Sequence, residues 1–270
     1  MRTGGSPEDS TVGATVGVAT ALEELKSRGS ALLVVGSVPE EVYAKVSSCL
    51  LGGDCTADRR RLVVEGAPAP DARYESVDRW TPEWTRILQC DVVARGSTAE
   101  AGGGESLPPS GPGTAGRGRS TGPTSRLSVG RSAHPTTGEN ETRREATRNV
   151  EGSIAELGVD IGEAIQQFDA IAGGLEPAEL RVGFDCVDTL LAEYDERTVF
   201  RFLHVLANDA RAANGMAHVR LSQPFDADST RLFAPLFDAV IELRLNGSEP
   251  EQRWHLRDAD TVSEWLPVDA

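Results

Sequence analysis

Four acidic side chains lie close together in one eleven-residue segment. They are Asp185, Asp188, Glu193 and Asp195, and the first of them ends the apolar run 180–185. Neighbouring carboxylates can coordinate a divalent cation or act as a general acid and base. The chain carries 42 acidic residues, however, so clusters of this kind also arise by chance. We therefore assign no catalytic residue and no metal ligand from this spacing alone.

A second polar group lies on the long helix expected at 196–213. Its members recur at helical spacing and share one stripe: Arg197, Arg201, His204, Asn208 and Arg211. On an acidic chain, three arginines in one stripe could form an interaction face for an acidic protein partner or for a second copy of the chain. The alternative is a solvated helix face whose arginines pair with Glu196 and Asp209.

The other histidines and the cysteines match no motif for metal binding or catalysis. His218 falls in an expected strand and His255 in an expected hairpin, both without a carboxylate or cysteine at ligand spacing. The four cysteines form no C-x-x-C motif: Cys49, Cys55, Cys90 and Cys186. Cys186 is expected to be a buried core thiol. The sequence thus predicts no metal site and no disulfide framework, which is typical of a reducing cytosol.

The charge of the chain is strongly negative. Its net charge is −15, and only Lys26 and Lys45 are lysines among 27 basic residues. Acid excess with few lysines is typical of proteins from a salt-rich cytoplasm, because salt screens the repulsion between carboxylates. The same charge disfavours nucleic acid as a partner. No apolar run approaches the length of a membrane span, so we expect a cytoplasmic protein without membrane contact.

Alternating strands and helices must position these polar groups. Apolar runs predict strands at 31–36, 61–65, 87–94, 180–185, 216–221, 237–245 and 253–257. Amphipathic spacing predicts helices at 18–28, 40–51, 76–86, 160–172, 187–194, 196–213 and 227–236. This order predicts an α/β fold with a mainly parallel sheet, helices on both faces and a C-terminal antiparallel hairpin across Asn246-Gly247.

Composition divides the chain into one domain with a long insertion. Residues 1–17 and 261–270 are expected to be tails, and 18–94 together with 150–260 to form a single domain. Residues 95–149 are rich in Gly, Ser, Thr and Pro and lack aromatic side chains, which predicts a disordered insertion. The insertion carries eight arginines and five acids, so a weak tether to an acidic partner or to nucleic acid is the less favoured alternative.

Several phrases of the chain resemble a known family. The residues at 184–191, 200–206 (FRFLHVL), 217–218 and 236–240 (LFDAV) resemble a haloarchaeal family of RecA/KaiC-related domains of unknown function. The resemblance is best over 159–245. It implies a RecA/KaiC-like ATPase core, with a phosphate-binding loop after the first strand and a Walker B aspartate after a later one.

The resemblance implies a degenerate phosphate-binding loop. A P-loop reads G-x-x-x-x-G-K-[ST], because its amides cradle phosphate, its lysine neutralises charge and its hydroxyl binds Mg²⁺. The matching segment, 36–41, reads GSVPEE, so only Gly36 remains, followed by Ser37. Pro39 removes one amide donor, and Glu40 and Glu41 place negative charge where phosphate would bind.

Three further pocket positions follow from the same resemblance. Asp185 matches the Walker B aspartate, Glu65 the place of a catalytic glutamate, and Gln223 the place of a polar sensor. Polar residues also gather at strand ends simply because the chain meets water there. We therefore predict a non-catalytic regulatory or interaction module with no cofactor. The alternatives are a cryptic nucleotide-binding protein or NTPase using ATP and Mg²⁺, and a nucleic-acid-associated RecA-type protein.

Overall fold

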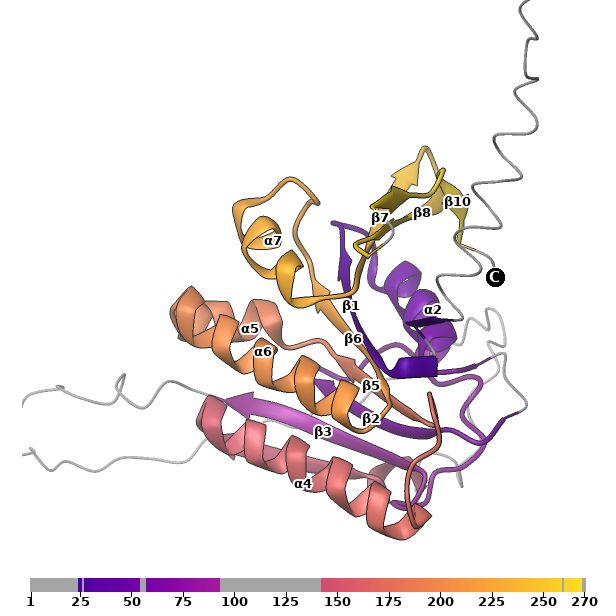
Figure 1. Ribbon diagram of the computed structural model, residues 1–270, viewed down its shortest axis with the longest axis vertical. Coiled ribbons are helices and arrows are strands. Elements are labelled where there is room, and N and C mark those ends of the chain that lie inside the picture. Colours follow the sequence, from indigo (N-terminus) through magenta and orange to yellow (C-terminus); the bar gives the residue numbers. More distant parts are fainter. Residues whose placement is uncertain (1–23, 26, 54–56, 93–141, 259, 269–270) are drawn as a thin grey trace, which may run out of the picture.

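The computed structural model describes residues 24–25, 27–53, 57–92, 142–258 and 260–268. Within these ranges, ten strands form one sheet (Figure 1). The parallel part comprises, in sheet order, β7 (Ala239–Asn246), β1 (Ser30–Val35), β6 (Met216–Leu221), β5 (Leu180–Phe184), β2 (Arg60–Glu65), β3 (Thr85–Val92) and β4 (Thr147–Gly152). The strand β8 (Glu249–Leu256) pairs antiparallel with β7, and β9 (Thr261–Val262) and β10 (Leu266–Pro267) pair antiparallel with β8. The mainly parallel sheet and the C-terminal hairpin are confirmed.

Helices cover both faces of this sheet, as predicted. The helix α2 (Glu40–Leu50) and the 3₁₀ turn η1 (Asp71–Arg73) lie on one face. The other face carries α4 (Ile154–Ala172), α5 (Val187–Glu193), α6 (Glu196–Ala212), α7 (Asp228–Phe233) and the 3₁₀ turn η2 (Ala234–Leu236). Successive side chains of a strand point to opposite faces. In β1, for example, Leu33 packs on the α6 side and Leu32 on the α2 side.

The long helix α6 forms where its apolar pattern predicts it. Val199, Leu203 and Ala210 lie on its buried side. Asp195 caps its N-terminus by accepting a hydrogen bond from the Thr198 amide at 3.0 Å, as expected. This capping fixes the face that α6 presents to the sheet and therefore also the face that it presents to solvent.

The order in which the chain adds strands to the sheet reverses at β1. The chain places β1 between β6 and β7, its last two parallel strands, whereas the other parallel strands all lie beyond β6. Ligands of open α/β sheets bind beyond the carboxyl ends of the strands at such a switch point. The predicted pocket residues lie at or near these strand ends, so this edge is where a site should be sought.

Two predicted boundaries around the insertion are wrong. The strand β4 begins at Thr147, inside the segment 95–149 that was predicted to be disordered, and pairs with β3. The helix α4 begins at Ile154 rather than at Asp160, because Ser153 forms a capping box with Glu156. Residues 1–17 and 95–141 lie outside the described residues, as does most of the helix predicted at 18–28.

Two other segments also differ from the predictions. No helix forms at 76–86, where turns lead directly into β3, because Trp80 and Trp84 have different partners. Trp80 packs on Tyr74, with ring centroids 5.6 Å apart, whereas Trp84 lies under the guanidinium of Arg60 at 4.4 Å. The segment expected to be a tail, 261–270, contributes β9 and β10, because these short strands gain backbone hydrogen bonds from β8.

Candidate functional site

Asp185 lies directly after β5 and is bound by two buried side chains. Arg73 from η1 donates to both carboxylate oxygens, with 3.1 Å between Nη2 and Oδ1. The hydroxyl of Tyr43, on α2, donates to Oδ1. Arg73 is fully buried and Tyr43 almost so. The oxygens that a hydrated Mg²⁺ would need are therefore occupied by the protein itself.

Glu65 joins the same group from the end of β2. Its Oε2 accepts a hydrogen bond from the Tyr74 hydroxyl at 2.7 Å and lies 3.8 Å from Nη1 of Arg73. The rings of Tyr43 and Tyr74 lie near the guanidinium, with centroids 5.7 and 5.9 Å from Cζ. We call these five residues, Arg73 with Glu65, Asp185, Tyr43 and Tyr74, the Arg73 cluster.

Within the Arg73 cluster, one guanidinium lies near two acidic side chains. Burial by itself would lower the pKa of Arg73, but Asp185 and the other neighbours raise that pKa above its ordinary value, so the guanidinium stays charged. Burial raises the pKa of Glu65, while the hydrogen bond from Tyr74 and the charge of Arg73 oppose this rise. Burial and the nearby Asp185 raise the pKa of Tyr43 well above its usual range, which keeps its hydroxyl protonated as a donor.

A glycine in β5 makes room for this arrangement. A Cβ atom on Gly183 would lie 2.7 Å from Nη2 of Arg73 and 3.0 Å from Cε1 of His218. His218, on β6, is buried and lies 2.8 Å from the Oγ atom of Ser47 on α2. Burial, and then the charges of Arg73 and Arg181, lower the pKa of His218 well below its usual value. This histidine is thus a neutral structural group rather than an exposed base.

The loop after β1 is closed against its neighbours. The amide of Gly36 donates to the carbonyl of Gln223 at 2.8 Å, and a Cβ atom at this position would lie 2.3 Å from the Leu243 carbonyl oxygen. The Ser37 hydroxyl lies 3.5 Å from the carbonyl oxygen of Ser222. The structure therefore brings Gly36, Ser37 and Gln223 together. Within the described residues, no hydrogen bond joins these three to the Arg73 cluster.

The start of α2 does not fit a phosphate group. Pro39 provides no side-chain cap, and Glu40 binds Nη1 of Arg220 at 2.6 and 2.7 Å. A hollow of about 560 Å³ lies beside this loop, and its lining includes the carboxylates of Asp226 and Glu242 and the side chain of Arg244, whose guanidinium pairs with Glu251 at 2.7 Å. Carboxylates repel phosphate, and this loop supplies no lysine to offset them. The residues present at the switch point thus do not fit ATP and Mg²⁺.

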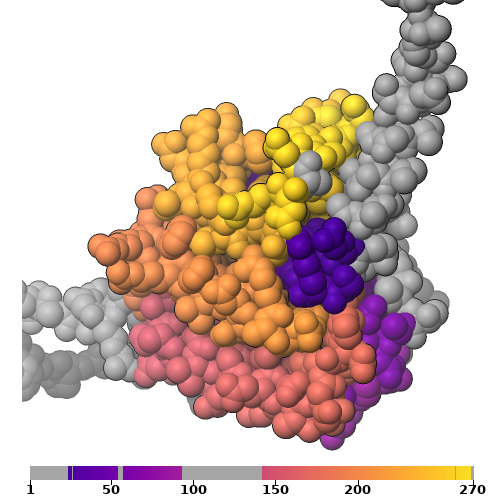
Figure 2. Space-filling view, viewed as in Figure 1, coloured from indigo at the N-terminus to yellow at the C-terminus, as the bar shows by residue number. Residues whose placement is uncertain are grey.

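The predicted stripe on α6 divides into two parts. Arg211 belongs to the fold, because its Nε donates to Asp238 at 3.0 Å and its Nη2 to the Leu236 carbonyl at 2.7 Å. The other four members are exposed: Arg197, Arg201, His204 and Asn208. Val205, 52% exposed, lies beside His204. Figure 2 shows the surfaces of α4 and α6 side by side on this part of the molecule.

The four acids after β5 do not converge on one site. Asp185 binds Arg73, Asp188 accepts from the Ser222 amide at 3.0 Å, Asp195 caps α6, and Glu193 is exposed at the end of α5. In the part of the chain that the structure describes, no group of three or more His, Cys, Asp or Glu side chains could hold a metal ion. Over the same residues, no helix is both long and apolar enough to cross a membrane.

Sequence reasoning did not find Arg73, Tyr43 or Tyr74. Arg73 lies in a loop segment with no periodic pattern, and nothing in its neighbours marks it as buried. The available signal was Gly183, a glycine inside an apolar strand, which often marks the close approach of another group. That close approach is the side chain of Arg73.

Comparison with known proteins identifies a family whose function is unknown. The model of a family of unknown function, DUF7504, matches residues 29–243. No curated protein matches. The KaiC-like protein PH0186 from the hyperthermophilic archaeon Pyrococcus horikoshii is similar in structure, with a TM-score of 0.47 and 11% identity over 89% of this chain and 85% of that protein. This TM-score is too low to establish a common fold, so the α/β architecture rests on the chain's own strand order.

Proposed function

The chain belongs to DUF7504, a family of unknown function, and we propose that it is a non-catalytic regulatory or protein-interaction module whose ATPase-like fold has lost nucleotide hydrolysis. One observation supports this proposal above the others. Asp185, the residue at the Walker B position, is bound by the fully buried guanidinium of Arg73. A carboxylate held in this way acts as the counter-ion of the arginine and is not free to coordinate a metal cation.

Recruiting Asp185 to Mg²⁺ would be costly. The metal would have to displace Arg73, and leaving one partner of a buried ion pair unpaired costs about 3–5 kcal/mol. Each 1.4 kcal/mol is a tenfold change in affinity, so this cost alone weakens binding by more than a hundredfold. The closed loop at Gly36 and the carboxylate of Glu40 add to the barrier.

Nucleotide titration tests this proposal directly. We expect no calorimetric heat of binding for ATP-Mg²⁺ and no phosphate release, in a buffer with molar salt. Asp185→Asn keeps the shape of the side chain, and Asp91→Asn, at an exposed position of β3, is the matched control. Hydrolysis that is lost in Asp185→Asn but kept in Asp91→Asn would contradict the proposal.

The exposed part of the α6 stripe is the proposed interaction face. Arg197 and Arg201 project from an acidic chain, which favours an acidic protein or a second copy of this chain as the partner. Nucleic acid is disfavoured by the net charge of −15.

Sedimentation at rising salt concentration tests self-association through this face. We expect the wild type to associate and Arg201→Glu to weaken the association, whereas Arg148→Glu, an exposed arginine on β4, should leave it unchanged. Association that is equally strong in all three proteins would rule out this face. A wild type that stays monomeric would exclude the second copy and leave an acidic protein as the partner.

A further inference from the structure

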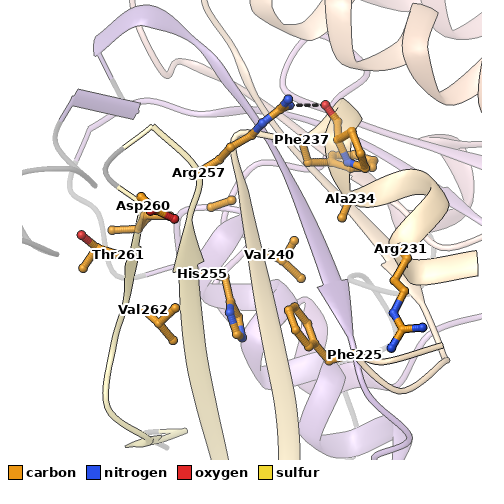
Figure 3. A pocket seen from close by; sticks show the side chains of 13 residues that line it. Phe225, Arg231, Ala234, Phe237, Val240, His255, Arg257, Asp260, Thr261 and Val262 are labelled. Carbon is orange, nitrogen blue, oxygen red and sulfur yellow. Dashed lines mark hydrogen bonds between the residues drawn. The ribbon is translucent and has the colours of Figure 1, made fainter. Parts of the chain in front are cut away.

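A separate pocket of about 450 Å³ lies between the α7–η2 segment and the adjacent face of β7 and β8 (Figure 3). Val240 lies near its centre, and none of its lining residues belongs to the Arg73 cluster. Its volume is within the range of small-molecule sites, about 300–1,000 Å³. The pocket is therefore a second candidate site, independent of the Arg73 cluster.

The walls of the pocket are mainly apolar, and ring stacking and a side-chain contact hold them in place. The ring of Phe225 stacks on the imidazole of His255, with centroids 4.0 Å apart and planes 13° apart. Nε2 of His255 lies 3.0 Å from Oε2 of Glu242, which fixes the orientation of the imidazole. Val262 lines the opposite wall and is 52% exposed. A flat aromatic wall and branched aliphatic side chains suit an apolar body.

Positive charge lies at one side of the pocket. Arg231 projects beside Phe225, and its guanidinium pairs with Asp228 at 3.5 Å, although both side chains are largely exposed. Such an exposed pair contributes little, so a ligand can compete for the guanidinium. Arg257 donates to the Pro235 carbonyl and so ties β8 to η2. The carboxylate of Asp260 lies on the side away from Arg231, where it does not oppose an anion bound there.

We infer that this pocket binds an apolar molecule that carries a single carboxylate. The apolar body packs on Val240 and on the Phe225–His255 stack, and the carboxylate pairs with Arg231. A guanidinium matches a carboxylate with two parallel hydrogen bonds. In the described part of the chain, Arg231 is paired only with the exposed Asp228, so a ligand carboxylate can take the place of that one partner. A di- or triphosphate would bring more negative charge than one arginine can offset. This inference goes beyond the proposed function and does not depend on whether nucleotide binding has been lost.

Calorimetric titration with defined acids tests the inference. The probes are 3-phenylpropionate and octanoate, and the control ligand is 3-phenylpropanamide, which has the same ring but no charge. We expect both acids to bind in a saturable way and the amide to bind at least tenfold more weakly. Saturable binding absent up to about 10 mM for both acids, well above a millimolar Kd, would overturn the inference, as would equal affinity for the amide.

Three variants locate the binding. Arg231→Gln removes the charge at an exposed position and should lower the affinity for both acids at least tenfold. Val262→Trp fills the pocket from its exposed rim and should abolish binding. Arg148→Gln, remote from the pocket lining, should bind as the wild type does. Acid binding that survives in both Arg231→Gln and Val262→Trp would place the site elsewhere and overturn the inference.

One further control separates a small ligand from a peptide. A short peptide ending in a free phenylalanine carboxylate presents the same two chemical groups. Binding of this peptide without binding of either small acid would overturn the small-molecule inference. Binding of the acids at least as tightly as the peptide would support it.

Discussion

At β5 the two faces of the central sheet carry different side chains, although one strand supplies both. In β5, Val182 and Phe184 pack into the apolar layer beneath α4 and α6. The alternate positions of this segment are Arg181, Gly183 and Asp185, and they face α2. At β5, period-two alternation thus separates hydrophobic from charged positions, whereas β1 and β7 also supply apolar side chains to the α2 face.

The difference shows how each face specifies its helix. Apolar packing is non-directional, so α6 is positioned by shape and by its own cap. In addition to apolar packing, directional contacts position α2: Arg61 and Arg181 donate to the carbonyls of Leu51 and Leu50, and Arg220 binds Glu40. Buried ion pairs add little net stability but cost much when one partner is removed. These directional contacts therefore hold one arrangement of α2, in which the loop after β1 is closed.

The largest expected effect is at the centre of the Arg73 cluster. Arg73→Met should destabilise the protein by about 3–5 kcal/mol, because it leaves Asp185 buried without its counter-ion. Adding Asp185→Asn should recover part of this loss, since the second change removes the unpaired charge. Urea denaturation of the wild type, both single variants and the double variant measures the coupling. Losses that simply add would show that the two residues do not act as a pair.

The apolar layer should respond to truncation without such a recovery. Leu203→Ala on α6 should cost about 3 kcal/mol through lost burial and a residual cavity. A second truncation nearby, Val182→Ala, should deepen the loss. The same urea series measures both. A double variant more stable than Leu203→Ala would show that this face also holds a strained or unfavourable group, and the contrast between the two faces would fail.

A pH titration separates the faces through His218. Because the folded-state pKa of His218 lies well below 6.5, the unfolded chain takes up a proton first as pH falls. Stability contributed by this residue is therefore full above pH 6.5 and is lost below it, by up to about 1.4 kcal/mol per pH unit. The raised pKa of Glu65 acts in the opposite sense, with stability lost as pH rises through its folded pKa.

The comparison with His218→Gln isolates this slope, since both proteins contain Glu65. Melting temperatures between about pH 6.5 and pH 5 should fall more steeply for the wild type than for the variant. The Leu203→Ala variant, changed only on the apolar face, should keep the wild-type slope. Equal slopes in the wild type and His218→Gln would contradict the assignment of a neutral buried histidine.

Much of the architecture could be predicted from the sequence, because its signals are local. The apolar run of β5, the periodic face of α6 and the cap at Asp195 each lie within one short segment. The boundaries at β4 and β9 could not be predicted, since these short strands are held by neighbours distant in sequence. Pairing between strands overrides weak local preference.

The candidate site was predictable in its positions but not in its chemistry. The resemblance named Glu65 and Asp185 as pocket residues, and in the structure both carboxylates lie near the guanidinium of Arg73. The side chain near both carboxylates is Arg73, 112 positions before Asp185, and only the folded chain shows that contact. Arg211 is a second example. The sequence placed it in the polar stripe of the helix, but in the folded chain it pairs with Asp238, which is distant in sequence.

The smallest expected effect compares the ends of two helices. On the apolar side, α4 carries its own capping box, in which the Ser153 amide donates to Glu156 at 2.7 Å and the Ser153 hydroxyl accepts from the Glu156 amide at 3.3 Å. On the α2 face, α2 begins at Glu40, and the preceding Pro39 provides no side-chain cap. Ser153→Ala should therefore cost about 1 kcal/mol.

Amide hydrogen exchange locates this loss as well as measuring it. In Ser153→Ala the first turn of α4 should exchange faster, while the first turn of α2 should not change, because the sheet arginines and not a cap hold that helix. Ser248→Ala, at an exposed turn position, is the matched control and should change stability by less than about 0.5 kcal/mol. Faster exchange in α2 as well would mean that the two faces are coupled through the sheet and do not specify their helices independently.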